Sequence, residues 1–242
     1  MPGFTTCPVV DNHCHVLEPE KKIIEPIWLA REFFHGIADT PIAGVAKSKL
    51  WGATDDLLFH FPHMGVVLTL VCQLAKLFGC EPTLEAVTAE RNRRTAEAGL
   101  AGYAQMLYTD AGIACSVMDS NLPINDPIFD LTPGRKIRLL QMDPLLSTLL
   151  ESSASYAEFL RAFQAGVEKS IRQDGFVGIK SHLGERVGFG AAPVEADEAE
   201  RYFLAAKAGD GEAFKKIYMA VVLASLIQAQ ELKFPIHFHT GI

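Results

Sequence analysis

Two pairs of histidines in this sequence are each separated by a single residue. The first pair is His13 and His15 in "VVDNHCHVLEP", and the second is His237 and His239 in "PIHFHTGI". Side chains alternate across a β-strand, so the two rings of each pair face the same way. Two neutral imidazoles can bind one divalent ion, since zinc–nitrogen bonds are about 2.0–2.1 Å long. An isolated pair is more often two hydrogen-bonded polar residues at a strand end, but the presence of two pairs favours a metal site.

The two histidines of the second pair differ in their place along the strand. His239 lies at the predicted end of its strand and is followed by Thr-Gly. His237 lies about 6–7 Å deeper by the rise of a strand, which favours a place beside the ligands or in the core. We therefore expect His13, His15 and His239 to converge as metal ligands.

Lys180 ends an apolar segment in "GFVGIKSHLGERVGFG". A lysine that finishes a buried strand needs a partner for its charge. Three roles stay open for it: a carboxylated bridge between two metals, a donor to substrate, or a partner of a carboxylate. The alternative is a lysine whose long side chain reaches solvent.

The remaining pattern predicts the elements that would position these residues. Short apolar segments that read as strands buried on both faces lie at residues 7–13, 113–118, 136–142, 175–180 and 234–239. Helical patterns lie at residues 82–107, 155–172 and 212–232, and Ser155 with Glu158 predicts the start of the second of these. Alternating strands and helices predict an α/β fold with a parallel sheet. In an α/β barrel, active sites lie at the carboxyl ends of the strands.

The connection between the first two strands, from about residue 16 to 112, is too long for a bare loop. Helical runs at about 20–35, 64–78 and 82–107 predict a helical insertion, which we place at about 18–110. His63 lies in this segment and could reach a substrate, although a surface histidine is the commoner case.

Three polar residues follow predicted strands: Asp119 and Asn121 come after the second, and Asp143 comes after the third. Such loop positions favour capping of the backbone as the default role. We therefore leave these residues out of the predicted site.

Composition excludes some classes of protein. The chain has 242 residues, 49% of them hydrophobic, and a net charge of −7. An acidic chain without a basic block is a poor partner for nucleic acid. No apolar run is long enough for a membrane span, and no signal peptide is visible. The five cysteines are scattered, which predicts reduced thiols in a cytoplasmic protein.

Four segments together resemble the amidohydrolase superfamily, and within it the amidohydrolase-related (amidohydrolase 2) branch. That branch occurs alone in bacteria and fused to glutamine-synthetase-like domains in fungi and plants. The resemblance rests on "DNHCHVL", "KIRLLQMDPLL", "GFVGIKSHLGERVGFG" and "PIHFHTG". It implies a single domain with a distorted (β/α)8 TIM-type barrel.

The resemblance also implies roles for particular residues. His13 and His15 would be metal ligands of strand 1, and His239 that of strand 5. Lys180 takes the place of the carboxylated lysine that bridges two metals in some members. His182 and Arg186 are approximate counterparts of an aromatic residue and an arginine near the substrate.

The sequence departs from the family pattern in one respect. Members use a strand-8 aspartate as metal ligand and general base, and no such residue can be assigned before Ile242. We therefore expect a barrel truncated after strand 5 and completed by another copy of the chain or by a partner segment.

The expected activity is hydrolysis of a C–N or C–O bond in a small molecule, such as an amide or lactone, by a metal-activated water. Lys180 and His239 would take part in catalysis. Zinc is the expected metal, with manganese and iron as alternatives. The same residues are compatible with a decarboxylase or an isomerase of this superfamily, or with a non-catalytic barrel that serves as a binding or assembly module.

Overall fold

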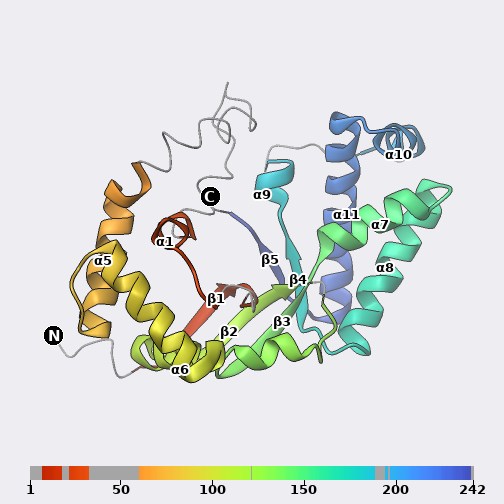
Figure 1. Cartoon of the computed structure of the whole chain (residues 1–242). Helices are drawn as coiled ribbons and strands as arrows, with labels where there is room; N and C mark the ends of the chain where they lie inside the picture. Colours follow the sequence, from red (N-terminus) through yellow and green to blue (C-terminus); the bar gives the residue numbers. More distant parts are fainter. Residues whose placement is uncertain are drawn as a thin grey trace. The chain divides into compact units, whose positions relative to one another are not determined.

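The computed structural model describes residues 7–17, 22–32, 60–120, 122–188, 194–195 and 197–240. The chain divides into two compact units. The first unit draws on residues 1–16, 112–129 and 134–241, and the second on residues 17–111 and 130–133. Figure 1 shows the elements of both units.

The first unit is built on a five-stranded sheet. Its strands lie in the order of the sequence, and every neighbouring pair is parallel (Figure 1). The strands are β1 (Val9–Cys14), β2 (Ile113–Ser120), β3 (Arg135–Gln141), β4 (Gly178–Ser181) and β5 (Ile236–Phe238). The α/β class and the parallel sheet are thereby confirmed, and all five predicted strands are present.

The sheet is curled into a half-barrel. Parallel strands lie about 4.8 Å apart, so β1 and β5 would be roughly 19 Å apart in a flat sheet. The rings of His13 in β1 and His237 in β5 nevertheless have centroids 5.6 Å apart. The Lys180 amine of β4 also reaches the His13 ring, at 2.9 Å. These side chains therefore all lie on one concave face, as expected in a TIM-like half-barrel.

The opposite face of the sheet carries the main apolar core. Ile179 of β4 packs there with side chains from α7 (Met142–Ser152), α8 (Tyr156–Arg172), α10 (Ala199–Lys207) and α11 (Gly211–Leu232). The predicted start of α8 is confirmed: the Ser155 hydroxyl accepts from the Glu158 amide, and the Glu158 carboxylate accepts from the Ala154 amide.

Some local predictions were wrong. β3 ends at Gln141, and α7 starts at Met142, so Asp143 lies in the first turn of a helix and not in a loop. Asp119 lies within β2, not after it. Two helices, α7 and α10, and the short α9 (Leu183–Arg186) and η3 (Pro127–Leu131) were not predicted. α10 was missed because its nine residues lie among short polar segments without clear periodicity.

β1 is not the doubly buried strand that its sequence predicts. Val9 is 42% exposed and Val10 is 56% exposed. In the part of the chain that the structure describes, β1 pairs only with β2, and β5 only with β4. The strands that carry His13 and His237, the first members of the two pairs, therefore form the edges of the described sheet.

The second unit consists, in its described residues, of the helices α1 (Pro26–Glu32), η2 (Phe61–His63), α5 (Gly65–Phe78) and α6 (Leu84–Ala111). They enclose a core of their own around Val67, Val71 and Val87. The predicted helices at 64–78 and 82–107 are confirmed, except that α6 is interrupted at Gly99, where φ is 71°. The interpretation of this unit as an insertion in a barrel stays a prediction. Among the described residues, no helix combines the length and the apolarity needed to cross a bilayer.

Candidate metal centre

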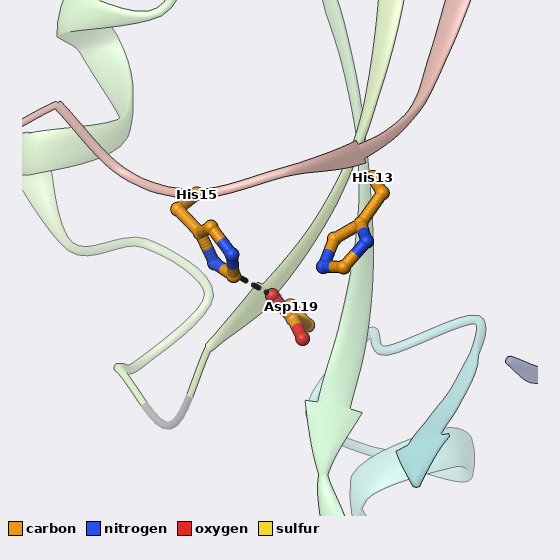
Figure 2. A group of neighbouring side chains, drawn as sticks. All are labelled: His13, His15 and Asp119. Carbon is orange, nitrogen blue, oxygen red and sulfur yellow. Dashed lines mark ion pairs between the residues drawn. The ribbon is translucent and has the colours of Figure 1, made fainter. Parts of the chain in front are cut away.

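Three side chains of the first unit converge on the concave face of the sheet. One donor atom from each of His13, His15 and Asp119 lies within 4.8 Å of the other two. Figure 2 shows the three side chains, with His15 and Asp119 joined as an ion pair. His13 lies in β1, His15 follows its end, and Asp119 is the penultimate residue of β2.

An irregularity of β1 contributes to this convergence. The register with β2 runs from Asp11 opposite Ser116 to Cys14 opposite Met118, so it shifts within the segment that contains His13. The Asp11 carboxylate accepts a hydrogen bond of 3.2 Å from the His13 amide within this segment. Bulges of this kind redirect a side chain next to a functional site.

Asp119 is the negatively charged residue with which both His15 and Lys180 pair. Its side chain is only 1% exposed. Oδ1 lies 3.1 Å from His15 Nδ1, and Oδ2 lies 3.5 Å from Lys180 Nζ. Burial alone would raise the pKa of Asp119, but His15 and the positive charge of Lys180 outweigh it and hold the pKa well below its usual range. Asp119 is therefore a buried carboxylate beside an exposed histidine.

Lys180 is fully buried beside this carboxylate. Its side chain is 0% exposed, so the alternative that it reaches solvent is wrong. Its amine lies 2.9 Å from His13 Nε2. Burial lowers the pKa of Lys180, and Asp119 opposes that shift. Lys180 is thus the nearest positive charge to the predicted ligands.

The two histidines of the first pair respond to these neighbours in opposite ways. Burial, aided by Lys180, lowers the pKa of His13 to about 4. His13 is therefore neutral near pH 7, as a metal ligand must be. The Asp119 carboxylate raises the pKa of His15, whose side chain is 66% exposed.

The donor set fits a divalent cation. Neither carboxylate oxygen of Asp119 has a hydrogen bond of normal geometry among the described residues, and the buried His239 Nδ1 has none either. The Asp119 oxygens still have His15 and Lys180 as charged neighbours, but a buried atom without a hydrogen bond, such as His239 Nδ1, is rare unless an ion or water binds it. Ligands of a tetrahedral zinc ion are about 3.4 Å apart, so donor atoms that lie up to 4.8 Å apart would have to move closer by up to about 1.4 Å. Nitrogen and carboxylate ligands are typical of zinc, and also suit manganese and iron.

The second histidine pair lies against the first. The His239 ring centroid is 5.2 Å from that of His13, and its backbone amide donates to the Ser181 carbonyl at 2.8 Å, directly after β5. His237 pairs with Lys180 in the register of β4 and β5. Burial, aided by Lys180, lowers the pKa of His237. The structure thus brings His239 next to the group, while its role as a ligand stays a prediction.

The predicted substrate residues lie in two places. His182 precedes α9 and Arg186 ends it, and both contact Asp143, with His182 Nδ1 at 2.9 Å and Arg186 Nε at 3.5 Å. The His182 ring is 5.4 Å from that of His239. His63 is exposed and belongs to the second unit, so its predicted contact with substrate stays a prediction.

Asp119 is the residue that sequence reasoning left out of the site. A signal for it was present, because Cys115, Val117 and Asp119 alternate along one strand and so share a face. Asp119 ends that run, and residues at the carboxyl ends of parallel strands are the ones that face an active site. Ending the strand at residue 118 hid this alternation.

Comparison with known proteins supports the fold. No protein-family model matches the chain, and no curated protein matches it. One solved structure is similar: a protein from Lactobacillus casei ATCC 334 that is provisionally named a metal-dependent hydrolase. The TM-score is 0.68 at 18% sequence identity over 97% of this chain. The match spans 58% of the length of that protein.

Proposed function

We propose that His13, His15 and Asp119 bind a divalent metal ion, and that the protein is a metal-dependent hydrolase of the amidohydrolase type. The observation that carries this proposal is the buried Asp119 carboxylate, which lies within 4.8 Å of donor atoms of both His13 and His15 and faces a neutral histidine. The name of the structurally similar Lactobacillus protein supports the same class of activity.

The proposed ligands are His13 of β1, His15 just after it and the Asp119 carboxylate, with His239 as a further ligand. Lys180 would be a ligand only if carboxylated, because its ammonium has no lone pair. When bound, a zinc ion would polarise a substrate carbonyl and lower the pKa of a water. Zinc is the preferred ion on this donor set, ahead of manganese and iron.

Three residues near the proposed ligands would neutralise charge or orient the substrate. The fully buried Lys180 ammonium balances the charge of Asp119 and donates to His13 Nε2. His182 and Arg186 would orient a small substrate, since both lie beside Asp143 at the carboxyl ends of the strands. The bond that is broken would be a C–N or C–O bond, as in an amide or a lactone.

We further propose that the active site is completed by residues outside the described sheet. The chain spans 58% of the length of the similar solved structure. We propose that a second copy or a partner segment covers the edge strands β1 and β5 and completes the site. A cytoplasmic location fits this reading.

The experiment is to purify the full chain, remove metal with a chelator, reload it with zinc, manganese or iron, and measure hydrolysis of a panel of amides and lactones. We expect metal binding by the chain alone, and turnover only where a second copy or a partner segment completes the site; that turnover should require metal and be lost in Asp119→Asn. The control is Asp174→Asn, which makes the same chemical change in an exposed ion pair with Lys169. Hydrolysis that persists in the chelated protein would contradict the proposal, and metal binding without turnover in the completed site would favour the non-catalytic module.

A further inference from the structure

A second polar network lies next to the candidate metal centre, around Asp143. The Asp143 Oδ2 atom lies 2.9 Å from His182 Nδ1 and accepts from the Tyr218 hydroxyl at 3.2 Å. Tyr218 is fully buried in α11, while Asp143 lies in the first turn of α7 and His182 follows β4. Three separate elements thus converge on one carboxylate.

Tyr218 makes hydrogen bonds to His182 and Asp143 whose directions are clear, whereas either hydroxyl can donate in its 3.3 Å contact with Ser181. The His182 amide donates to the Tyr218 oxygen at 3.0 Å. Burial raises the pKa of the Tyr218 hydroxyl, so the hydroxyl stays protonated. It donates a hydrogen bond to Asp143. An ionised carboxylate only accepts, so the His182 nitrogen that faces it must carry a hydrogen.

A hydrogen on Nδ1 determines whether the other ring nitrogen of His182, Nε2, can accept a hydrogen bond. A neutral imidazole with a hydrogen on Nδ1 has a lone pair on Nε2, which can accept a hydrogen bond. A carboxylate that fixes the tautomer of a histidine is a recurring device in active sites and around metal ligands.

The His182 ring is connected to the candidate metal centre through contacts between histidine rings. Its centroid is 5.4 Å from that of His239, and the His239 centroid is 5.2 Å from that of His13. The four residues Asp143, His182, His239 and His13 therefore form one chain of contacts from α7 to β1.

We propose that Asp143 and Tyr218 are positioning residues that hold His182 as the Nδ1–H tautomer, so that Nε2 accepts a hydrogen bond from the substrate. The substrate would then carry an N–H or O–H donor close to the bond that is broken, as a secondary amide does. This assignment of substrate class rests on the proposed hydrolase function, whereas the tautomer does not.

The tautomer can be measured by NMR on the full chain with ¹⁵N-labelled histidine rings. Two-bond proton–nitrogen correlations distinguish Nδ1–H from Nε2–H, and loss of signals in His182→Gln assigns the ring. We expect Nδ1–H in the wild type. Asp143→Asn should convert His182 to Nε2–H or to a mixture, because an amide group can donate to Nδ1. The control Asp174→Asn should leave the spectrum unchanged.

Tyr218→Phe provides a second variant. It keeps the Asp143 carboxylate but removes the hydroxyl that donates to it. We expect the His182 signals to retain Nδ1–H and to broaden as the ring loses one of its restraints. Zinc binding should be unchanged in both variants, since neither residue is among the predicted ligands.

The outcomes separate this inference from the proposed function. An Nε2–H tautomer in the wild type, or an unchanged tautomer in a folded Asp143→Asn, would overturn the positioning role. A metal-bound shift of His182 Nε2 after zinc addition would overturn its role as an acceptor. Failure of the wild type to bind zinc would defeat the proposed function but leave the tautomer result intact.

A kinetic readout tests the substrate class. In the hydrolysis panel, Asp143→Asn should lower kcat/KM for secondary amides by about tenfold, the size of one hydrogen bond. Tertiary amides lack the donor and should be affected much less. An equal loss for both kinds of amide would rule out the proposed hydrogen bond.

Discussion

Ile179 and Lys180 are neighbours in β4, and both side chains are 0% exposed. Ile179 faces the apolar core with α7, α8 and α11, while Lys180 faces the candidate metal centre. Burial of the isoleucine is favourable in itself, at about 1.5–3 kcal/mol. Burial of an ammonium is unfavourable unless a carboxylate or another acceptor lies beside it. One face of β4 therefore stabilises the fold through Ile179. The other face buries Lys180 at a cost in free energy, so stability does not explain why it is there.

The difference between the two faces points to function. Ionisable groups cluster at active sites because chemistry requires charges in places that water does not reach. On the concave face, Lys180, Asp119 and His13 depend on one another for their charge states. The apolar face does not have this interdependence, so variants on the two faces should respond differently to metal and to pH.

The largest effect is expected for Lys180→Met in the chelated protein. The substitution leaves the buried Asp119 carboxylate without its nearest full positive charge, and breaking a buried pair in this way costs about 3–5 kcal/mol. Zinc should restore much of the loss, because the ion replaces the missing charge. Denaturant unfolding with and without zinc measures both effects.

The matched control for this variant is Lys169→Met. Lys169 is an exposed lysine in a surface ion pair with Asp174. Its substitution should change the unfolding free energy by less than about 1 kcal/mol. If Lys180→Met is as mild as the control, Lys180 does not neutralise Asp119 in the folded protein.

The pH dependence of stability should come from the concave face. In the chelated protein, the unfolded chain takes up a proton at His13 near pH 6.5, but the folded chain does so only near pH 4. The unfolding free energy should therefore fall as the pH is lowered between these values. His13→Gln should flatten this part of the profile, measured by urea unfolding from pH 4 to 8.

His15 should act in the opposite sense. Its folded pKa is raised by Asp119, so its contribution is fully present below pH 6.5 and is lost as the pH rises through the folded pKa. His15→Gln should flatten the neutral part of the profile. Identical profiles for the wild type and both variants would show that the concave face does not set the pH dependence.

A smaller effect is expected on the apolar face. Ile179→Val removes one methylene from a fully buried site and should cost about 0.5–1.5 kcal/mol. Neither zinc nor pH should change that cost, because no charge is involved. A zinc-dependent effect of Ile179→Val in unfolding measurements would mean that the two faces are coupled.

The strand positions were predictable from the sequence, because buried parallel strands are short apolar runs between turn signals. His13 and His15 could be placed on one face because the period of a strand is two, and Lys180 could be placed near them because it ends an apolar run. The exposure of Val9 and Val10 could not be predicted, since it depends on which segments lie beside β1.

The Asp143 network was also beyond the sequence. Asp143, His182 and Tyr218 are far apart in the chain and come together only through the packing of α7 and α11 on the sheet. Asp119 was missed for a local reason, because the predicted strand ended one residue too early. The packing of helices on a sheet, unlike the periodicity within one element, could not be predicted from this single sequence.

The central claim is that Asp119 and the β1 histidines bind a divalent metal, and calorimetric titration of zinc into the chelated full chain tests it most directly. We expect saturable binding in the wild type and in Asp174→Asn, and an affinity at least about 100-fold weaker in Asp119→Asn. Circular dichroism would establish that the variant is folded. Wild-type zinc affinity in a folded Asp119→Asn would contradict the account.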